Sequence, residues 1–478
     1  MNYTEYLKTS GRAKFTLALL IAEVAVMAYL SFQAASYLGI TAGIIGMAVS
    51  LVLGGLIWLC HRKKPTAAAV IEVILAILLI LAVVVMGKIN SVAGNIGRTT
   101  EYETVQIVAL KDSEIKESDD FSDYILGYTN SDEGAYDRSS EILEENKKKV
   151  KKSKPYESTE NLYEDLQSSD AQLMVLTSNT RSDLSVIDEE YEDKIVVLFE
   201  KKFALGTASL KAVDISEEPF TVYLCGADLS SGEDINSTGR GDVNILLTVN
   251  PKTKQVNMQA IPRDTFVYIP CRGGSSKLSY SGWWGGVQSS IDSIEDKFGV
   301  EINYYAKINF NGLIDLVDAL GGVTVYSHYT YSSQGYDFTE GYNEVDGEKA
   351  LHFARARKML PQNELSRGQH QMELIKGIFK KFAENPTYEN SMAVLDSLSN
   401  NFVTNLPKED YYKAFKLVVD LLPQLQTMEN QSIEGEYKWH YDEIREGHYQ
   451  YYYYPEPGEI QRVKTTIDGI LDGEKVNS

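Results

Sequence analysis

The sequence predicts a membrane-anchored α/β protein with three N-terminal transmembrane helices, a small accessory α/β domain, and a larger α/β domain whose mixed central sheet lies between helices. Three long apolar segments fill the first ninety residues. Beyond them, apolar runs of strand length alternate with helical patterns, first in an acidic stretch and then in a longer one, which is typical of layered α/β domains. We place the three parts at residues 1–90, 91–215 and 216–478.

The apolar segments cover residues 15–32, 37–60 and 67–86. Each is close to the roughly 20 residues that a helix needs to cross a bilayer. Basic residues precede the first segment and fill the second loop: Lys8, Arg12, Lys14 and residues 61–64. Because positive charge marks the cytoplasmic side, we expect a multi-pass protein of the cell membrane with a cytoplasmic N-terminus and a large extracellular C-terminal part. A cleaved signal peptide does not explain three spans.

Glu23 and Glu72 interrupt the first and third apolar segments. A carboxylate within a membrane segment can mark a proton path, but it can also be neutral, paired or close to an interface. We favour a structural role for both residues.

Composition limits the partners of the chain. Its 478 residues include 67 acidic and 46 basic ones, a formal net charge of −21. Nucleic acid is therefore excluded as a main partner, because binding to phosphate backbones needs a basic surface. The cysteines Cys60, Cys225 and Cys271 do not form a disulfide framework, although a bond between Cys225 and Cys271 stays an open alternative.

In the accessory domain, strands are predicted at residues 104–110, 171–176 and 194–199, with polar helical stretches between them. Six of the eight residues at 147–154 are lysines. Such a run is typical of the solvated end of a helix. The alternative is contact with anionic lipid headgroups or wall polymers, which attract polybasic segments.

The larger domain opens with a strand that runs into Asp228. A hairpin follows, in which the apolar run after Asp242 is joined to residues 255–261 through the turn-forming sequence NPKTK. Helical patterns cover residues 289–298, 311–320, 347–353, 369–383, 388–398 and 409–422. The tyrosine-rich stretch at 449–459 is predicted to be a strand or a rim of aromatic packing.

Charged residues collect at the ends of these elements: Asp228, Arg240, Asp242, Arg263, Asp264, Arg355, Arg357, Glu364 and Arg367. Any one cluster alone is typical of a surface salt bridge. Together, at the rim of one sheet, they indicate a site for a metal-bound anion, because guanidinium groups bind phosphate oxygens in pairs and carboxylates bind Mg²⁺.

Arg355 and Arg357 impose a condition on the local structure. Residues two apart point to nearly opposite sides of a helix but share one face of an extended segment. If both arginines bind one anion, the helix is expected to end before Arg355, and Pro361 is compatible with that break.

The motifs GAD, GRGDVNILLTVNPKTKQV, IPRDT, ALGGV, DGEKALHFARAR and SRGQHQ, with Lys277 between them, resemble the LytR–CpsA–Psr family of Gram-positive wall-polymer transferases. The resemblance spans residues 220–381, and the three spans and extra outer domain are similar to the capsule-associated CpsA branch. It implies a metal-dependent phosphotransferase that moves a glycan, here capsular polysaccharide, from a polyprenyl-pyrophosphate carrier to peptidoglycan. It also implies Mg²⁺ (or Mn²⁺) at the headgroup and an apolar tunnel for the lipid.

Carried over by position, the resemblance implies that Asp228 and Asp242 hold the metal. The pyrophosphate ligands are then Arg240, Arg263, Lys277, Arg355, Arg357, Arg367 and Gln371. Arg263, Asp264 and Glu364 form the candidate catalytic set, with Asp264 or Glu364 as the guess for a general base. Glu364 stands where an Asp is common and His370 where an Arg is common, so one headgroup contact is lost or becomes pH-dependent. Arg240-Gly241-Asp242 is thus a metal-and-phosphate corner rather than an adhesion signal.

Several alternatives stay open. The strand face formed by Val243, Ile245, Leu247 and Val249 either packs in the core or lines a lipid tunnel. Trp283 and Trp284 either stack on a sugar, seal the tunnel mouth or pack in the ordinary way. A rival function is a membrane regulator that binds polyprenyl phosphates or polymer without turnover, and a weaker rival is a pyrophosphatase. Capsule-synthesis membrane proteins are further candidate partners.

Overall fold

The computed structural model describes residues 11–38, 40–63, 65–130, 132, 134–188, 190–229, 233–384, 388–428, 431–444 and 449–474. The chain divides into two compact units. One comprises Met1–Gly97 with Leu406–Asp420, and the other comprises Arg98–Asn405 with Leu421–Ser478.

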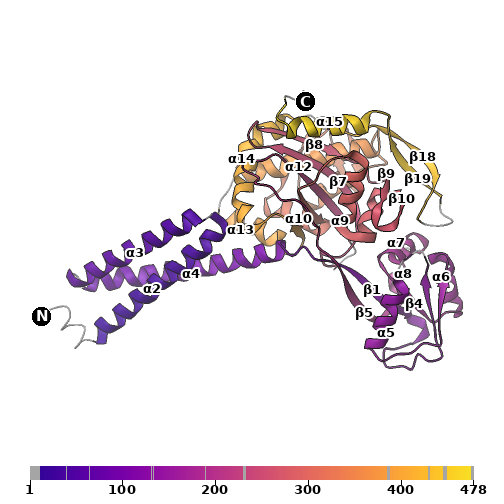
Figure 1. Cartoon of the computed structure of the whole chain (residues 1–478), viewed down its shortest axis with the longest axis horizontal. Helices are drawn as coiled ribbons and strands as arrows, with labels where there is room; N and C mark the ends of the chain where they lie inside the picture. Colours follow the sequence, from indigo (N-terminus) through magenta and orange to yellow (C-terminus); the bar gives the residue numbers. More distant parts are fainter. Residues whose placement is uncertain are drawn as a thin grey trace. The chain divides into compact units, whose positions relative to one another are not determined.

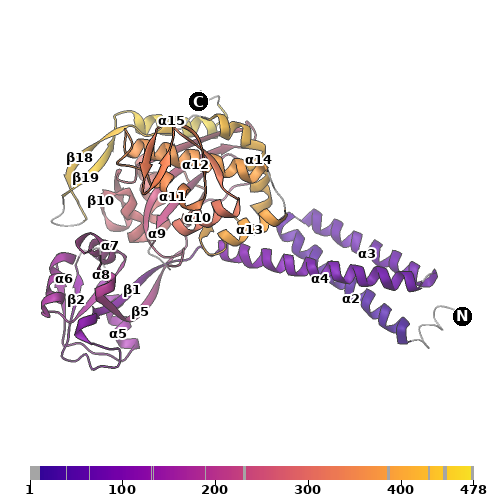
Figure 2. The same ribbon diagram turned by 180° about the vertical axis from the view of Figure 1, so that it is seen from behind.

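The first unit contains the three predicted apolar helices, α2 (Gly11–Leu38), α3 (Ile40–Lys63) and α4 (Pro65–Ile96) (Figures 1 and 2). By length and composition, each can cross a membrane. Glu72 is buried within this unit, and its Oε1 lies 2.7 Å from Nε2 of His61. This pairing agrees with a structural role for Glu72. Lys8 and Lys64, which entered the orientation argument, lie outside the described residues.

The accessory domain is a five-stranded mixed sheet in the order β3-β2-β4-β1-β5. Its elements are β1 (Glu101–Leu110), η1 (Lys111–Ser113), β2 (Ile125–Thr129), α5 (Ala135–Glu145), β3 (Lys152–Tyr156), α6 (Thr159–Ser168), β4 (Leu173–Leu176), α7 (Ser178–Ile187), α8 (Tyr191–Lys194) and β5 (Ile195–Gly206). Ile107 of β1 packs with Ile142 of α5, whereas the next residue, Val108, packs with Leu162 of α6. Helices therefore cover both faces of this sheet.

The lysine-rich run at 147–154 is not the solvated end of a helix, so that prediction was wrong. Helix α5 ends at Glu145, and Lys152 already belongs to strand β3. Strand β3 lies at the edge of its sheet. Lysines on an edge strand keep its free backbone groups from pairing with another chain, which gives Lys152 and Lys154 a structural explanation.

The larger domain is built on a six-stranded mixed sheet in the order β16-β11-β6-β7-β8-β17. The strands are β6 (Phe220–Asp228), β7 (Arg240–Asn250), β8 (Gln255–Ala260), β11 (Tyr304–Asn309), β16 (Phe402–Thr404) and β17 (Gln431–Ser432). Strands β7 and β8 are antiparallel and joined by a turn at residues 251–254, which confirms the predicted hairpin. Strand β11 pairs with β6 in parallel.

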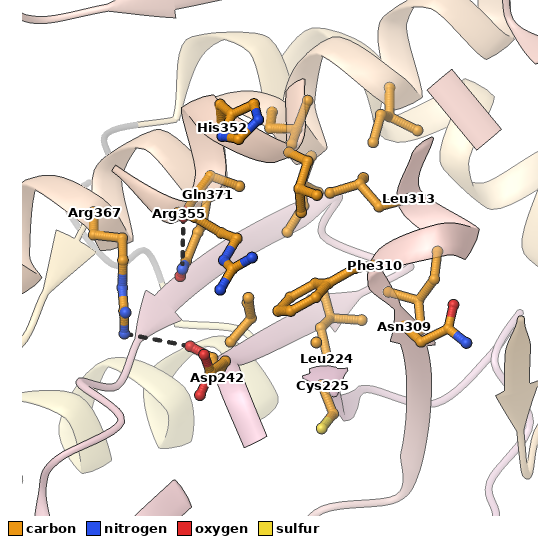
Figure 3. Close-up of a pocket in the computed structure, with 18 of the residues that line it drawn as sticks. Leu224, Cys225, Asp242, Asn309, Phe310, Leu313, His352, Arg355, Arg367 and Gln371 are labelled. Atoms are coloured by element: carbon orange, nitrogen blue, oxygen red, sulfur yellow. Dashed lines mark hydrogen bonds between the residues drawn. The ribbon is translucent and has the colours of Figure 1, made fainter. Parts of the chain in front are cut away.

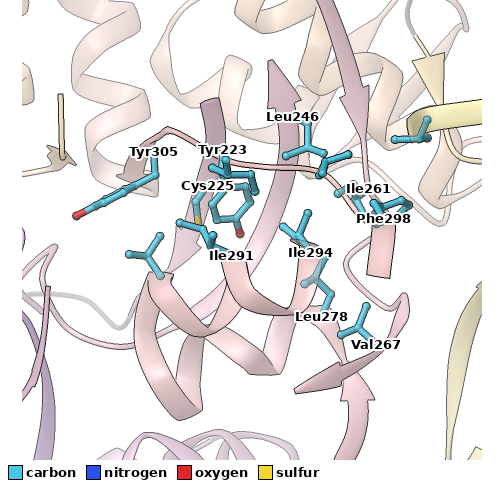
Figure 4. Packing of buried hydrophobic residues seen from close by; sticks show 14 of the residues in the cluster. Tyr223, Cys225, Leu246, Ile261, Val267, Leu278, Ile291, Ile294, Phe298 and Tyr305 are labelled. Atoms are coloured by element: carbon cyan, nitrogen blue, oxygen red, sulfur yellow. The ribbon is translucent and has the colours of Figure 1, made fainter. Parts of the chain in front are cut away.

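Helices cover both faces of this central sheet. Tyr223 of β6 packs with Ile291 of α9 (Leu278–Phe298) in the cluster of Figure 4, which also includes Ile467 of α15 (Glu459–Leu471). The next residue, Leu224, faces the opposite side and packs with Met372 of α12 (Glu364–Glu384). The predicted layers of helix, mixed sheet and helix are confirmed.

The other elements include the predicted helices at 311–320, 347–353, 388–398 and 409–422, together with short strands between residues 266 and 345 that were not predicted. They are β9 (Phe266–Ile269), η2 (Pro270–Arg272), β10 (Gly274–Lys277), α10 (Phe310–Ala319), β12 (Val323–Ser327), β13 (Tyr331–Ser333), β14 (Tyr336–Phe338), β15 (Gly341–Val345), α11 (Gly347–Arg355), α13 (Tyr388–Leu398), η3 (Lys408–Asp410), α14 (Tyr411–Thr427), β18 (Gly435–Tyr441) and β19 (Tyr449–Pro455). Helix α9 begins eleven residues earlier than expected and breaks at Gly285 and Gly286, because its first turns are rich in glycine and serine and conceal the helical pattern. Cys60, Cys225 and Cys271 are all free.

A buried ion pair joins the accessory sheet to the central sheet. Nζ of Lys307 on β11 lies 2.6 Å from Oε1 of Glu101 on β1, and both side chains are at most 6% exposed. Lys307 also donates to the main-chain oxygen of Ser237 at 2.9 Å, and the second carboxylate oxygen of Glu101 accepts from the Val287 amide. A glycine is required at position 286, because a Cβ there would collide with the Glu101 carboxylate.

Replacing Glu101 by Leu should lower the free energy of unfolding by about 3–5 kcal/mol, because the Lys307 ammonium stays buried without its carboxylate. The double variant Glu101→Leu/Lys307→Met should lose less, since it buries no charge. Urea unfolding followed by circular dichroism measures both losses. A double variant as unstable as the single one would refute the importance of this pair.

Candidate functional site

A cavity of about 770 Å³ lies between the central sheet and helices α10, α11 and α12. Its walls are largely apolar: Leu224 and Val243 come from strands β6 and β7, Leu313 from α10, and Leu374 from α12. A concave apolar site of this size suits a ligand with a hydrocarbon part.

Charged side chains gather at one end of the cavity, where Figure 3 shows Asp242, Arg355 and Arg367 on the side away from Leu313. The polar lining residues from the sequence-predicted set are Asp242, Arg263, Arg355, Arg357, Arg367 and Gln371. They come from the start of β7, the loop after β8, the end of α11 and the first turns of α12. Cations are in excess here, so this end of the cavity attracts anions.

Ion pairs link these residues into a continuous chain. Arg263 donates through Nη1 to both carboxylate oxygens of Asp242, at 2.8 and 2.7 Å. Nη2 of Arg367 donates to the main-chain oxygen of Asp242 at 3.4 Å and lies 2.6 Å from Oε2 of Glu364. Oε1 of Glu364 is 2.6 Å from Nε of Arg357. Carboxylates thus hold the arginines in place before a ligand binds, which is electrostatic preorganisation.

Asp264 continues this chain behind the cavity lining. Its carboxylate lies 3.1 Å from Nζ of Lys277 and 3.3 Å from Nη2 of Arg357, and it accepts from the Tyr437 hydroxyl at 3.3 Å. Burial alone would raise the pKa of Asp264, but Lys277, Arg263 and Arg357 outweigh it and hold the pKa below its usual value. A carboxylate stabilised in this way orients its neighbours and is a weak base.

Glu364 also lies behind the arginines rather than in the cavity lining. Burial raises its pKa, and the nearby guanidinium groups of Arg367 and Arg357 offset only part of that effect. Of the two candidates for a general base, Asp264 and Glu364, neither lines the cavity. Both are placed to position arginines.

Asp228 and Arg240 lie opposite each other where strands β6 and β7 pair, close to Asp242. Burial raises the pKa of Asp228, and the Asp242 carboxylate raises it further. Two carboxylates that repel each other are stabilised by a cation, so this pair would hold a divalent metal only if Asp242 gave up its bonds to Arg263, which occupy both carboxylate oxygens in this structure. No group of three or more metal-ligating side chains occurs in the described part of the chain. The other ligands would be phosphate oxygens and water, as is usual for Mg²⁺.

Helix α11 ends with Arg355, one residue later than the expected break, and Ala356 has a non-helical ψ of 127°. Arg355 and Arg357 both line the cavity. Arg355 is exposed, with its guanidinium 4.5 Å from the Phe310 ring, whereas Arg357 is held by carboxylates.

The two adjacent tryptophans have different roles. Trp283 stacks on Tyr280 with ring centroids 5.2 Å apart, and the Arg240 guanidinium lies 4.2 Å from its ring. Trp284 packs against the cluster under α9. Trp283 therefore helps to position Arg240 of the predicted site. Trp284 packs in the ordinary way, which was one of the alternatives left open by the sequence.

The strand face that includes Val243 and Ile245 both packs in the core and lines the cavity. Val243 lines the cavity, whereas Ile245 is buried with Met258 and Met372. Core packing and cavity lining therefore occur along one strand.

His370 does not contribute to the cavity lining. It is buried on α12, where its ring stacks on Phe353 at 4.2 Å and on Tyr331 at 5.4 Å. Burial lowers its pKa to about 4. The residue is therefore neutral at physiological pH and belongs to the aromatic core, not to a headgroup contact.

The sequence interpretation missed Tyr437. Its hydroxyl lies 3.4 Å from Nη2 of Arg357 as well as within hydrogen-bond distance of Asp264. Alternation along the last strands could have placed Tyr437 on one face of a ribbon. No local signal, however, indicates that this ribbon returns to the segment around residue 264.

An apolar cavity with a preorganised cationic end defines a site for an amphiphile with an anionic headgroup. A sequence model of the LytR_cpsA_psr family matches residues 188–468, more than half of the chain. The chain therefore belongs to this family, and the resemblance in its motifs is confirmed.

Among known relatives, the chain is similar to two proteins named polyisoprenyl-teichoic acid–peptidoglycan teichoic acid transferase TagU. It is 37% identical over 198 residues to that of Enterococcus faecalis, covering 41% of this chain and 65% of the relative. It is 37% identical over 202 residues to that of Bacillus licheniformis, covering 42% and 65%. The match thus spans just under two thirds of these relatives' length. The crystal structure of TagU from B. subtilis is 29% identical, with 55% of this chain and 100% of that chain covered and a TM-score of 0.42.

The buried His370 predicts a pH dependence of stability. The unfolded chain binds a proton at this residue below about pH 6.5, whereas the folded chain does so only near pH 4. Stability should therefore fall as the pH drops through this window, by an amount on the order of 3 kcal/mol. His370→Phe should remove this part of the acid sensitivity, as measured by urea unfolding at pH 7 and 4.5. Equal pH dependence in both proteins would contradict the assignment.

Proposed function

We propose that the chain transfers a glycopolymer from a polyprenyl-pyrophosphate carrier to peptidoglycan. The observation that carries the proposal is the apolar cavity with a cationic end lined by Arg263, Arg355, Arg357 and Arg367. A polyprenyl pyrophosphate has the two matching parts, a long hydrocarbon tail and a polyanionic headgroup. Membership of the family and the names of the relatives support the same chemistry.

In the proposed reaction an acceptor hydroxyl attacks the phosphorus that carries the glycan. A new P–O bond forms, the bridging P–O bond breaks, and polyprenyl phosphate leaves while the hydroxyl loses its proton to solvent. Negative charge grows on the leaving phosphate, where Arg263, Arg357 and Arg367 can stabilise it without rearranging. Mg²⁺ or Mn²⁺ held by Asp228 and Asp242 would supply Lewis-acid charge neutralisation.

Two polymers are candidates for the cargo. Three apolar helices and an accessory domain support capsular polysaccharide, through the similarity to the CpsA branch, whereas the names of the relatives support teichoic acid. The basic last turn of α3 supports an extracellular position for the α/β domains, on the side of the membrane where peptidoglycan lies.

The direct test uses the full chain in detergent with a polyprenyl-pyrophosphate glycan, peptidoglycan fragments and Mg²⁺. One arm supplies a capsular repeat and the other a teichoic acid. Polymer should appear on peptidoglycan, and Arg263→Ala should lower the rate by about 100-fold or more, because a preorganised donor to the phosphate is lost. Arg98→Ala, which removes an exposed arginine outside the cavity, is the matched control.

Two results would overturn the proposal. Lipid that binds but is never turned over would favour a membrane regulator. Free glycan released without a peptidoglycan product would favour a pyrophosphatase.

Ala306 of β11 lines the cavity and offers a test of tail binding. Ala306→Phe should fill part of the cavity and weaken binding of a long polyprenyl pyrophosphate by about tenfold, since about 1–2 kcal/mol of tail burial is lost. Geranyl pyrophosphate, with a much shorter tail, should lose less. The control is Ala204→Phe on an exposed position of β5. Equal losses for both lipids would argue against a tail in this cavity.

A further inference from the structure

The hairpin of β18 and β19 lies at the rim of the larger domain, near β9 and β10 (Figures 1 and 2). The strands pair in the register Tyr437↔Tyr453, Trp439↔Tyr451 and Tyr441↔Tyr449. Because side chains alternate along a strand, these six aromatic residues share one face of the ribbon. Only the Gly435–Pro455 pair at the inner end of this face is not aromatic, and six aromatic side chains in a row call for an explanation.

The opposite face of the ribbon attaches it to the domain. Phe266 of β9 packs on His440, Tyr452 and Tyr454, with ring centroids 5.1–5.3 Å away. The main-chain amide of Tyr453 also donates to the main-chain oxygen of Asp264 at 2.8 Å. The domain thus packs against this face of the ribbon and against the inner end of the other face, where Tyr453 is buried.

The outer part of the first face is open to solvent. Trp439 and Tyr451 are each 58% exposed, Tyr449 is 56% exposed and Tyr441 is 37% exposed. Their rings touch one another: the Trp439 centroid is 4.7 Å from Tyr451 and 6.4 Å from Tyr449, and Tyr441 is 5.3 Å from Tyr449. We call these four residues the aromatic strip. A contiguous exposed patch of this kind indicates a binding surface.

The aromatic strip is continuous with the candidate site. Its inner neighbours on the same face are Tyr437 and Tyr453, whose rings are 5.3 Å apart. The Tyr437 hydroxyl lies within 3.4 Å of Arg357, which lines the charged end of the cavity. A ligand lying along the strip therefore points toward the phosphate-binding arginines.

The chemistry of the strip favours a sugar chain. Pyranose rings present a flat face of C–H groups that packs on aromatic rings, and their hydroxyl groups can bond tyrosine hydroxyls. Membrane-binding surfaces combine apolar side chains with Lys or Arg. None of the six aromatic positions on this face carries a charge.

We infer that the aromatic strip binds the glycan strand of peptidoglycan and directs an acceptor hydroxyl to the phosphate site; this inference rests on the proposed transfer reaction. The donor glycan is already held in place through its pyrophosphate and lipid. The acceptor has no covalent link to the cavity, so it needs a surface of its own to raise its local concentration near the phosphorus. The strip is linked to the charged end of the cavity through Tyr437 and Arg357.

The test measures binding of peptidoglycan fragments from amidase digestion, which leaves the glycan strands intact, to the full chain in detergent, without donor. Trp439→Ala and Tyr451→Ala should each raise the dissociation constant by about threefold to tenfold, the range for one lost aromatic contact. Tyr342→Ala removes an even more exposed tyrosine (77%) from strand β15 and should have no effect. In transfer assays the strip variants should raise KM for peptidoglycan and leave donor binding unchanged.

Unchanged fragment binding in both strip variants would overturn the inference. So would a loss of donor affinity equal to the loss of acceptor affinity, which would assign the strip to the donor glycan. Loss of binding to phosphatidylglycerol vesicles alone would assign it to the membrane, and a change of oligomeric state alone would assign it to a second copy. If the wild-type chain binds fragments through the strip but never transfers polymer, the proposed function fails while the binding surface stands.

Discussion

The ion pairs of Arg357 with Asp264 and Glu364 hold together segments that are far apart in the chain. Asp264 follows β8, Glu364 opens α12, and Arg357 lies in the segment between α11 and α12. Both carboxylates are at most 7% exposed. Loss of either one would leave a partly buried cation with one counter-charge fewer, which is unfavourable. The charged end of the cavity therefore exists only when all three segments have folded.

The balance of charge around the cavity couples ligand binding to folding. Among the residues predicted for the site, six cationic side chains stand against four carboxylates: Arg240, Arg263, Lys277, Arg355, Arg357 and Arg367 against Asp228, Asp242, Asp264 and Glu364. An excess of like charge in a partly buried place destabilises the folded state. An anion that binds only the folded chain at this site would neutralise that excess and stabilise the fold by mass action. The folded chain is therefore expected to be most stable with an anionic ligand bound.

Features that depend on local pattern could be predicted from the sequence. Apolar length predicted the three helices, and alternation predicted the β7–β8 hairpin. Charges at strand ends predicted a rim of arginines and carboxylates, because such groups cannot enter the core. Features that depend on distant partners could not be predicted: Tyr437 meets Asp264 across 173 residues, and the direction of His370 on α12 follows from the aromatic rings it packs against. The sequence likewise does not tell that Asp242 lines the cavity whereas Asp264 and Glu364 lie behind arginines, because this depends on side-chain geometry.

Helix α11 ends at Arg355, and as a result Arg355 and Arg357 lie in different environments. Arg355 is exposed and, in the described part of the chain, forms no ion pair, whereas Arg357 is clamped between two carboxylates. An exposed charge acts on approach, since its field reaches into solvent and speeds the encounter with an anion. A clamped charge acts after contact and lengthens the residence time of the ligand. For an anion that enters this cavity, Arg355 would thus contribute more to association and Arg357 more to retention, and salt in the medium would slow association far more than it weakens retention.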